Sequence, residues 1–211
     1  MRISTRVLKA EDPGAIQTAL AVLRRGGLVA FPTDTVYGVG ALAFDASAVE
    51  RVYTAKGRDT AKALPILMAN IGSASRVAEP LSAGTRTLAN AFWPGPLTLV
   101  VRKLASVPEA VSQGNTIGLR VPDHPVALAL LRESGPLAVT SANPSGGAES
   151  LSADEVVSGL GGKIDLVLDG GETPGGRPST VVDCTVEPPA LIREGPISLD
   201  AILMILGAGG A

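Results

Sequence analysis

The sequence predicts a single α/β domain, and three observations support this prediction. The chain has 211 residues, 45% of them hydrophobic, which is enough to bury one sizeable core. Short apolar runs rich in β-branched residues alternate with amphipathic stretches of helical spacing. No linker-like change of composition and no internal repeat divides the chain. We therefore expect one domain over residues 1–206, followed by a flexible tail over residues 207–211.

The first helix and the strand after it are predicted from local signals. Asp12-Pro13 supplies a capping residue and a proline suited to the first turn of a helix. Apolar side chains then recur on one face of that helix, at Ile16, Ala19, Leu20 and Leu23. Gly26-Gly27 ends the helix, and the apolar residues 28–31 form the expected strand.

The second helix is expected over residues 47–55 and carries two cations at its exit. Three apolar side chains share one face of it, namely Val49, Val52 and Tyr53. Gly57 suits the left-handed turn that follows a helix. Lys56 and Arg58 flank this turn, where we expect their side chains to swing freely toward a ligand.

The rest of the chain continues the alternation. β-branched and apolar runs predict further strands at residues 66–68, 97–101, 116–121, 137–139, 164–168, 180–183 and 190–193. Helical stretches are expected before Phe92, over residues 126–133, from the capping box at Ser152 toward Leu160, and from Ser198 to Leu206.

Composition excludes several classes of function. A net charge of −2 and an aromatic content of 3% argue against a protein whose main task is to grip nucleic acid. Neither a Gly-x-x-x-x-Gly-Lys-Ser/Thr loop nor a Gly-x-Gly-x-x-Gly fingerprint is present, so a P-loop or a dinucleotide fold of that kind is not expected. The single histidine, His124, lies in a turn-like Pro-Asp-His-Pro segment and supports neither a serine–histidine triad nor a multi-histidine metal site.

Location is also bounded by the sequence. No apolar run approaches the roughly 20 residues that span a bilayer, and the polar start is no secretory signal. The lone cysteine, Cys184, lies in a β-like run, where we expect it to serve packing rather than a disulfide. These features favour a cytoplasmic protein without a membrane partner.

Two polar motifs follow buried strands and indicate a site. The first is Pro32-Thr33-Asp34-Thr35-Val36-Tyr37-Gly38, with Lys56-Gly57-Arg58 further along; the second is Thr140-Ser141-Ala142-Asn143-Pro144-Ser145-Gly146. Hydroxyls, an amide and cations just past strand ends are typical of an α/β protein that binds a phosphate-bearing ligand. Such groups favour a reaction that needs positioning and neutralisation of charge, of which transfer at a nucleotide phosphate is the leading example.

These motifs, among them the Ser141-x-Asn143 pair, resemble a known family together with two later ones. The later motifs are the run from Pro178 to Asp183 and Ile192-Arg193-x-Gly195, and all stand in the order and spacing of the YrdC-type threonylcarbamoyl-AMP synthases. The resemblance extends from about Asp12 to Ile197, and it is to the short form without the additional C-terminal domain of longer members. It implies a twisted mixed β-sheet flanked by helices, with a concave ligand-binding face.

The resemblance implies an ATP-dependent enzyme. L-Threonine and bicarbonate or CO₂ would give N-carboxythreonine, whose carboxylate attacks the α-phosphate of ATP and releases pyrophosphate. Mg²⁺ would accompany the ATP, with no metal ligand expected on the chain itself. Threonylcarbamoyl-AMP would pass to partner proteins that complete the threonylcarbamoyladenosine modification of tRNA, and any direct contact with tRNA is expected to be weak.

The resemblance also assigns roles to residues. The catalytic, phosphate-binding tetrad would be Lys56, Arg58, Ser141 and Asn143. Further ATP contacts would come from Lys62, Thr116, Glu149 and Arg193. The threonine substrate would be bound by Thr33, Thr35, Arg120, Thr140 and Ser179, with Arg120 pairing with its carboxylate.

One departure and two alternatives stay open. Some relatives place a histidine near the threonine side chain where this chain has Leu67, which leaves amino-acid selectivity undecided. The first alternative is a paralogue of the same fold without synthase activity. The second is a non-catalytic RNA-binding module, and the acidic net charge counts against it.

Overall fold

A ten-stranded mixed β-sheet organises the computed structural model, which describes residues 4–208. Within these residues the strand order is β1-β8-β2-β3-β7-β4-β6-β5-β9-β10. The strands are β1 (Arg6–Lys9), β2 (Val29–Phe31), β3 (Gly38–Leu42), β4 (Ile66–Leu67), β5 (Leu97–Arg102), β6 (Thr116–Arg120), β7 (Leu137–Ser141), β8 (Leu166–Asp169), β9 (Thr180–Asp183) and β10 (Ala190–Arg193). The sheet contains parallel pairs (β1 with β8, β2 with β8, β4 with β6, β5 with β9) as well as antiparallel pairs such as β3 with β7.

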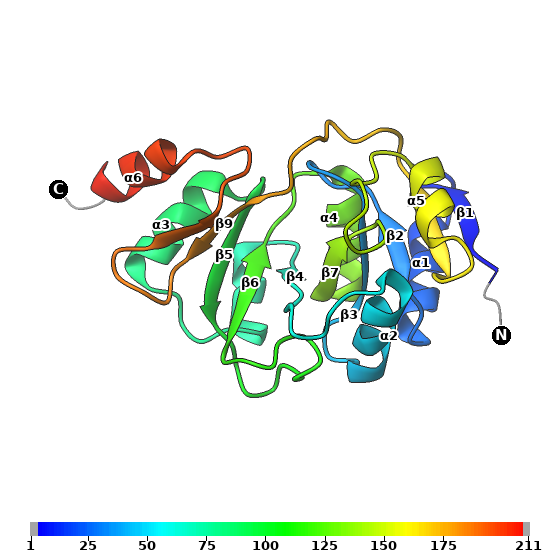
Figure 1. Ribbon diagram of the computed structural model, residues 1–211, viewed down its shortest axis with the longest axis horizontal. Helices are drawn as coiled ribbons and strands as arrows, with labels where there is room; N and C mark the ends of the chain where they lie inside the picture. Colours follow the sequence, from blue (N-terminus) through cyan, green and yellow to red (C-terminus); the bar gives the residue numbers. More distant parts are fainter. Residues whose placement is uncertain (1–3, 209–211) are drawn as a thin grey trace.

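Helices flank this sheet, as Figure 1 shows. They are α1 (Ala15–Arg24), α2 (Ala46–Lys56), α3 (Ala83–Phe92), α4 (Pro125–Ser134), α5 (Ala153–Leu160) and α6 (Leu199–Ala208), with a 3-10 helix, η1, over Ile71–Arg76. The first described residues lie beside β1 at one end of the molecule, and α6 lies beside α3 at the other. The twisted mixed sheet flanked by helices is the expected fold class.

Two hydrophobic cores lie on opposite faces of the sheet. The smaller core joins α1 and α4 to the strands through side chains such as Leu20, Phe31 and Leu131. The larger core joins α2, α3 and α5 to the other face and extends across β5 and β6. Burial of this much apolar surface is the main source of stability for a domain of this size.

Side-chain alternation in β5 and β6 leaves polar groups on one face. Leu97, Leu99 and Leu119 point into the larger core. Successive residues of a strand point to opposite faces, so Thr98 and Arg120 point the other way. On that face α1 packs against β8, β2 and β3, and α4 packs against α1. Space is thereby left for a site beside β4, β5 and β6.

The sequence missed two strands, β1 and β3. β1 is a largely exposed edge strand, Arg-Val-Leu-Lys, whose pairing partner β8 lies about 160 residues away, so no local pattern marks it. β3 contains Gly38 and Gly40, which weaken the strand signal. Gly40 is required there, because an added Cβ would lie 2.6 Å from the carbonyl oxygen of Ala138.

Helix ends were predicted with mixed success. Asp12 is not the cap of α1: the residue before the helix is Gly14, with φ 81°, and no side chain caps it. Gly57 does end α2 in the left-handed conformation, with φ 65°. Ser152 caps α5, and the Ser198 hydroxyl accepts a bond from the Ala201 amide at the start of α6.

The C-terminal helix runs slightly further than expected. It continues to Ala208, past the predicted end at Leu206. The remaining residues of the expected tail, 209–211, lie outside the described residues, so the boundary at residue 206 stays a prediction. In the described part of the chain no helix is both long and apolar enough to cross a membrane.

The two residues assigned structural roles have them. His124 is the cap residue of α4, and its Nδ1 accepts a bond from the Val126 amide at 3.3 Å. Cys184 is half-buried against the larger core, and burial raises the pKa of its thiol to about 11. A thiol of that pKa is a poor nucleophile at neutral pH.

Candidate functional site

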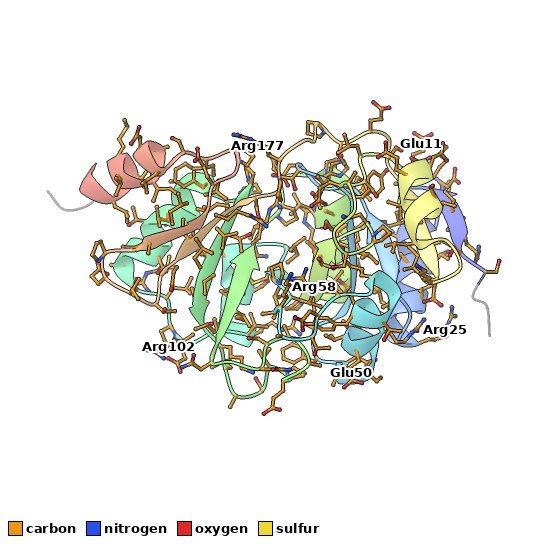
Figure 2. The ribbon with its side chains drawn as sticks, viewed as in Figure 1. Glu11, Arg25, Glu50, Arg58, Arg102 and Arg177 are labelled. Atoms are coloured by element: carbon orange, nitrogen blue, oxygen red, sulfur yellow. The ribbon has the colours of Figure 1, made fainter. Side chains whose placement is uncertain are left out.

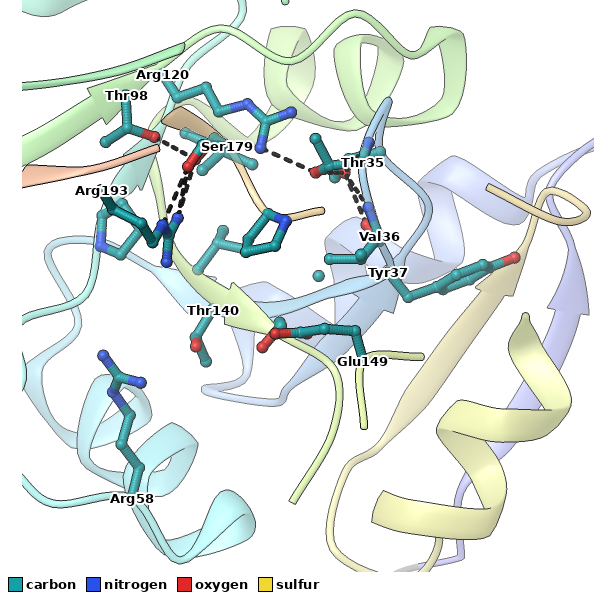
Figure 3. Close-up of a pocket in the computed structure, with 17 residues that line it drawn as sticks. Thr35, Val36, Tyr37, Arg58, Thr98, Arg120, Thr140, Glu149, Ser179 and Arg193 are labelled. Atoms are coloured by element: carbon teal, nitrogen blue, oxygen red, sulfur yellow. Dashed lines mark hydrogen bonds between the residues drawn. The ribbon is translucent and has the colours of Figure 1, made fainter. Parts of the chain in front are cut away.

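A cavity of about 220 Å³ lies where the β2–β3 loop meets strands β4 to β7. Its lining comes from segments far apart in the sequence: Thr33, Thr35, Val36, Tyr37, Gly38, Arg58, Pro65, Leu67, Thr98, Arg120, Val139, Thr140, Ser141, Glu149, Pro178, Ser179 and Arg193. Figure 3 shows Arg120, Thr98 and Ser179 toward one end, Arg58 toward the other, and Thr140 and Glu149 between them. The cavity thus combines hydroxyl groups with cations and a single carboxylate.

The β2–β3 loop is held in shape by its own hydroxyl groups. Thr33 Oγ1 donates to the carbonyl of Val36 at 2.7 Å and accepts bonds from the amides of Thr35 and Val36. The hydroxyls of Thr33 and Thr35 lie 3.0 Å apart, and both residues are buried. A turn tied in this way presents the Thr35 hydroxyl in a fixed position.

Arg120 is the buried cation of the cavity. It donates to the carbonyl of Gly95 from Nε (3.1 Å), to Thr35 Oγ1 from Nη1 (3.1 Å) and to Asp34 Oδ1 from Nη2 (2.6 Å). Burial lowers the pKa of Arg120, and the Asp34 carboxylate opposes that shift. The guanidinium stays charged, because arginine does not lose its proton in proteins.

A second hydroxyl pair lies beside Arg193, which is anchored by the backbone carbonyl of Ser179. Ser179 Oγ lies 2.8 Å from Thr98 Oγ1, and both residues are buried. Arg193 donates to the carbonyl of Ser179 from Nε (3.2 Å) and from Nη2 (2.8 Å). Burial lowers the pKa of Arg193, an effect that Glu149 opposes and Arg58 reinforces.

Lys56, Ser141 and Asn143 form a hydrogen-bonded cluster. Lys56 Nζ donates to the carbonyl of Ser141 and, at 3.2 Å, to Asn143 Oδ1. Ser141 Oγ donates to the same Oδ1 at 2.6 Å, and Asn143 Nδ2 donates to the carbonyl of Gly147 at 2.7 Å. Lys56 is only 5% exposed, so the expectation of a freely swinging side chain is wrong. The reason is that α2 ends against β7, where these oxygens meet the ammonium.

Burial gives Lys56 an unusual pKa. Loss of solvation lowers the pKa from 10.5 to about 8, while Glu149 raises it and Arg58 lowers it further. Glu149 Oε2 is buried and has no hydrogen-bond partner among the described residues. A buried carboxylate oxygen without a partner, near the cations of Lys56 and Arg193, is the kind of polar group that calls for a functional explanation.

Arg58 is the more accessible of the two cations in the tetrad. It is half-buried and donates from Nε and Nη2 to the carbonyls of Lys62 and Ala63, both at 3.2 Å. In Figure 2 it lies in the middle of the molecule, whereas other labelled arginines, such as Arg25 and Arg102, lie at the edge. Its guanidinium can therefore meet a ligand in the cavity.

The structure brings most of the expected site residues together. The ones that line the cavity are Thr33, Thr35, Arg58, Arg120, Thr140, Ser141, Glu149, Ser179 and Arg193. Lys56 and Asn143 do not line it, but they are bonded to Ser141, which does. Lys62 is exposed and Thr116 lies at the far end of β6 from Arg120, and neither lines the cavity.

Sequence reasoning missed Thr98 and Asp34. Thr98 is the one polar residue in the strand run Leu-Thr-Leu-Val-Val, and that exception to an apolar run was a usable signal. Asp34 belongs to the motif at residues 32–38, but its partner Arg120 is 86 residues away, so only the fold could pair them. Leu67 lines the cavity together with Val139 and Pro65, which makes this part of the wall apolar.

Comparison with known proteins places this chain in a family. Residues 21–195 match the Sua5/YciO/YrdC family model, which carries the description "Telomere recombination". The threonylcarbamoyl-AMP synthase of Pyrococcus abyssi is 42% identical over 209 residues, 98% of this chain and 62% of that protein. The chain spans about three fifths of the length of the first curated relatives it matches.

Solved structures agree in fold. The crystal structure of P. abyssi Sua5 complexed with L-threonine superposes with a TM-score of 0.90, at 41% identity over 98% of this chain and 61% of that one. The crystal structure of Escherichia coli YciO superposes with a TM-score of 0.82, at 27% identity over 95% of this chain and 99% of that one. On the match to the family model and on these relatives, the chain belongs to the Sua5/YciO/YrdC family.

Proposed function

We propose that the chain is an ATP-dependent L-threonylcarbamoyladenylate synthase. The carboxylate of N-carboxythreonine, formed from L-threonine and bicarbonate or CO₂, attacks the α-phosphorus of ATP. A bond forms between that oxygen and phosphorus, the bond from the α-phosphorus to the bridging oxygen breaks, and pyrophosphate leaves. The observation that carries the proposal is the cavity itself, which is lined by the buried cation of Arg120 and also by the cations of Arg58 and Arg193.

The amino acid occupies the end built by Arg120. The guanidinium pairs with its carboxylate, for which a planar fork of N–H donors is suited. Thr33, Thr35, Thr140 and Ser179 supply hydroxyl groups around it. The relative from P. abyssi supports this part of the proposal, because its structure was determined as a complex with L-threonine.

ATP occupies the end built by the tetrad. Lys56 and Arg58 neutralise phosphate charge, and Ser141 and Asn143 hold the Lys56 ammonium in place. Arg193 and Glu149 contact the nucleotide. Lys62 and Thr116 are assigned by resemblance alone, and they would reach ATP only where it extends beyond the cavity. A carboxylate nucleophile needs no strong base, so alignment and electrostatic stabilisation account for the catalysis.

Mg²⁺ enters the proposal as a companion of ATP. In the described part of the chain no group of three or more His, Cys, Asp or Glu side chains lies close enough to hold a metal ion. Glu149 is the one carboxylate among the cavity-lining residues. The phosphate oxygens of ATP would therefore supply most of the ligands, as is usual for Mg²⁺. The ion neutralises charge on the phosphates when it is bound.

The product would be passed on rather than released. Threonylcarbamoyl-AMP is a mixed anhydride, which hydrolyses readily, and proteins that transfer the threonylcarbamoyl group to tRNA would take it up. The net charge of −2 suits a protein that contacts tRNA only briefly.

A family paralogue without this activity is the second candidate. The observation beside it is the likeness to YciO, a family member that is not named as a synthase and of which the chain covers 99%. Mass spectrometry of the products separates the two. With ¹³C-labelled bicarbonate, L-threonine, ATP and Mg²⁺, the proposed enzyme yields threonylcarbamoyl-AMP carrying the label. A folded protein that binds ATP and yields no labelled adenylate fits the paralogue, and salt-dependent tRNA binding without turnover fits an RNA-binding module.

A further inference from the structure

We propose that Asp34 is a positioning residue, which sets the orientation in which Arg120 presents its free N–H groups to the carboxylate of the amino acid. This inference rests on the proposed function and assigns a role to a residue that does not touch the substrate. Asp34 is not among the residues that line the cavity, whereas Arg120 is.

The Asp34 carboxylate is itself fixed in place. Its Oδ1 accepts the bond from Arg120 Nη2 at 2.6 Å and a second bond from the backbone amide of Asp123 at 3.0 Å. The side chains of Arg120 and Asp34 are only 7% and 13% exposed. The oxygen therefore links three segments, namely the β2–β3 loop, the end of β6 and the turn before α4.

Three contacts leave a defined part of the guanidinium free. An arginine side chain has five N–H groups, and Arg120 uses three of them on Gly95, Thr35 and Asp34. One N–H on each terminal nitrogen is then left without a partner among the described residues. Since Arg120 lines the cavity, these two groups are the ones available to a ligand.

Asp34 determines which N–H groups of Arg120 stay available to a ligand. Without an acceptor at the position of Oδ1, Nη2 loses its anchor and the guanidinium is free to turn away from the geometry that a two-point contact needs. Bidentate contacts between arginine and carboxylate depend on that geometry, and small misplacements are costly in rate.

The second carboxylate oxygen of Asp34 supports a functional role for the pair that Asp34 forms with Arg120. Asp34 Oδ2 is buried and has no hydrogen-bond partner among the described residues. A buried carboxylate with one oxygen unsatisfied costs free energy of folding, so it is a poor choice for a purely structural link. Its retention is explained if the carboxylate serves Arg120, which must remain both charged and oriented in a buried place.

Two substitutions separate orientation from charge. Asp34→Asn keeps an accepting oxygen at the position of Oδ1 but removes the negative charge. Asp34→Glu keeps the charge but moves the carboxylate by one methylene. Isothermal titration calorimetry would measure binding of L-threonine and of L-threoninamide, which lacks the carboxylate, with ATP titrated separately. The ratio of the two dissociation constants reports the contact between Arg120 and the carboxylate.

We expect Asp34→Glu to lower the preference for L-threonine over its amide by about tenfold, and Asp34→Asn to keep most of it. ATP binding should stay unchanged in both variants. The positioning role would be overturned if Asp34→Asn lowered this preference more than Asp34→Glu, or if both variants lowered it equally. An equal loss of affinity for L-threonine and for its amide would also overturn it. If Asp34→Glu does not fold, Asp34→Ala takes its place, since it also removes the acceptor.

Asp165→Asn is the matched control. Asp165 forms the other partly buried ion pair with an arginine, to Arg51 at 2.9 Å, and neither residue lines the cavity. It should lose some stability and keep the ligand preference. A wild-type protein that binds L-threonine no better than the amide would instead refute the proposed function at Arg120, an outcome distinct from a failure of Asp34 variants alone.

Discussion

The ammonium group of Lys56 lies 3.2 Å from Oδ1 of Asn143, although 87 residues separate them in the chain. That oxygen also accepts the hydroxyl of Ser141 at 2.6 Å, so one amide holds two of the tetrad's other side chains. Three of the four tetrad residues are therefore held in place by one another, and electrostatic catalysis depends on such preorganisation.

Replacing Asn143 tests this arrangement. Asn143→Ala removes the acceptor for Lys56 and Ser141 and the donor to Gly147. We expect kcat/KM for ATP to fall by roughly 10²-fold and the free energy of unfolding to fall by about 1–3 kcal/mol. Steady-state kinetics and denaturant titration measure the two effects. Asn70→Ala, which removes a helix cap outside the cavity, should cost stability only; a kinetic loss of similar size there would contradict the account.

The pKa of Lys56 predicts a pH dependence. Its pKa of about 8 lies below the 10.5 of an exposed lysine, so the unfolded chain binds this proton more tightly than the folded chain. Between these values the group's contribution to stability rises with pH. Phosphate binding requires the protonated form, so kcat/KM for ATP should fall by about tenfold per unit above pH 8.

Glu149 provides the check on that assignment. The Glu149 carboxylate raises the pKa of Lys56, so Glu149→Gln should move the falling limb of the profile to lower pH. A limb that stays in place would mean that another group is titrating.

Arg58 should matter far more than cations at the edge of the molecule. Arg58→Ala removes a guanidinium from the cavity lining without opening a core, so the protein should stay folded and lose at least about 10²-fold in ATP-dependent turnover. Arg102→Ala removes an exposed arginine of β5 that does not line the cavity and should leave turnover unchanged. Near-normal turnover in a folded Arg58→Ala protein would remove Arg58 from the site.

Arg120 should affect one substrate more than the other. Arg120→Lys keeps the positive charge and loses the planar fork, so the KM for L-threonine should rise by about tenfold or more, with a smaller change in the KM for ATP. Initial rates with each substrate varied in turn give both values. Equal increases in the two KM values would argue against a carboxylate contact at Arg120.

Much of the fold was predictable because its signals are local. The helix that ends at Gly57, the cap at Ser152 and the apolar strand β5 depend on residues close in sequence. β1 and β3 could not be predicted, because what determines them is contact with strands that are distant in sequence. β1 is determined by its pairing with β8, and the glycines of β3 are required by the close approach of β7.

The site divides in the same way. The polar motifs after β2 and at the end of β7 marked the positions of Thr35 and Ser141 from sequence alone. The sequence could not show that Lys56 is buried, that Asp34 holds Arg120, or that Thr98 meets Ser179, because each depends on contacts across the sheet.

Release of pyrophosphate from ATP is the direct test of the proposed synthase activity. The purified chain would be incubated with ATP, Mg²⁺ and bicarbonate, with L-threonine present or absent. We expect release that depends on threonine and is lost in Arg58→Ala. Release that is absent, or that is the same without threonine, from a folded protein shown to bind ATP would contradict that activity.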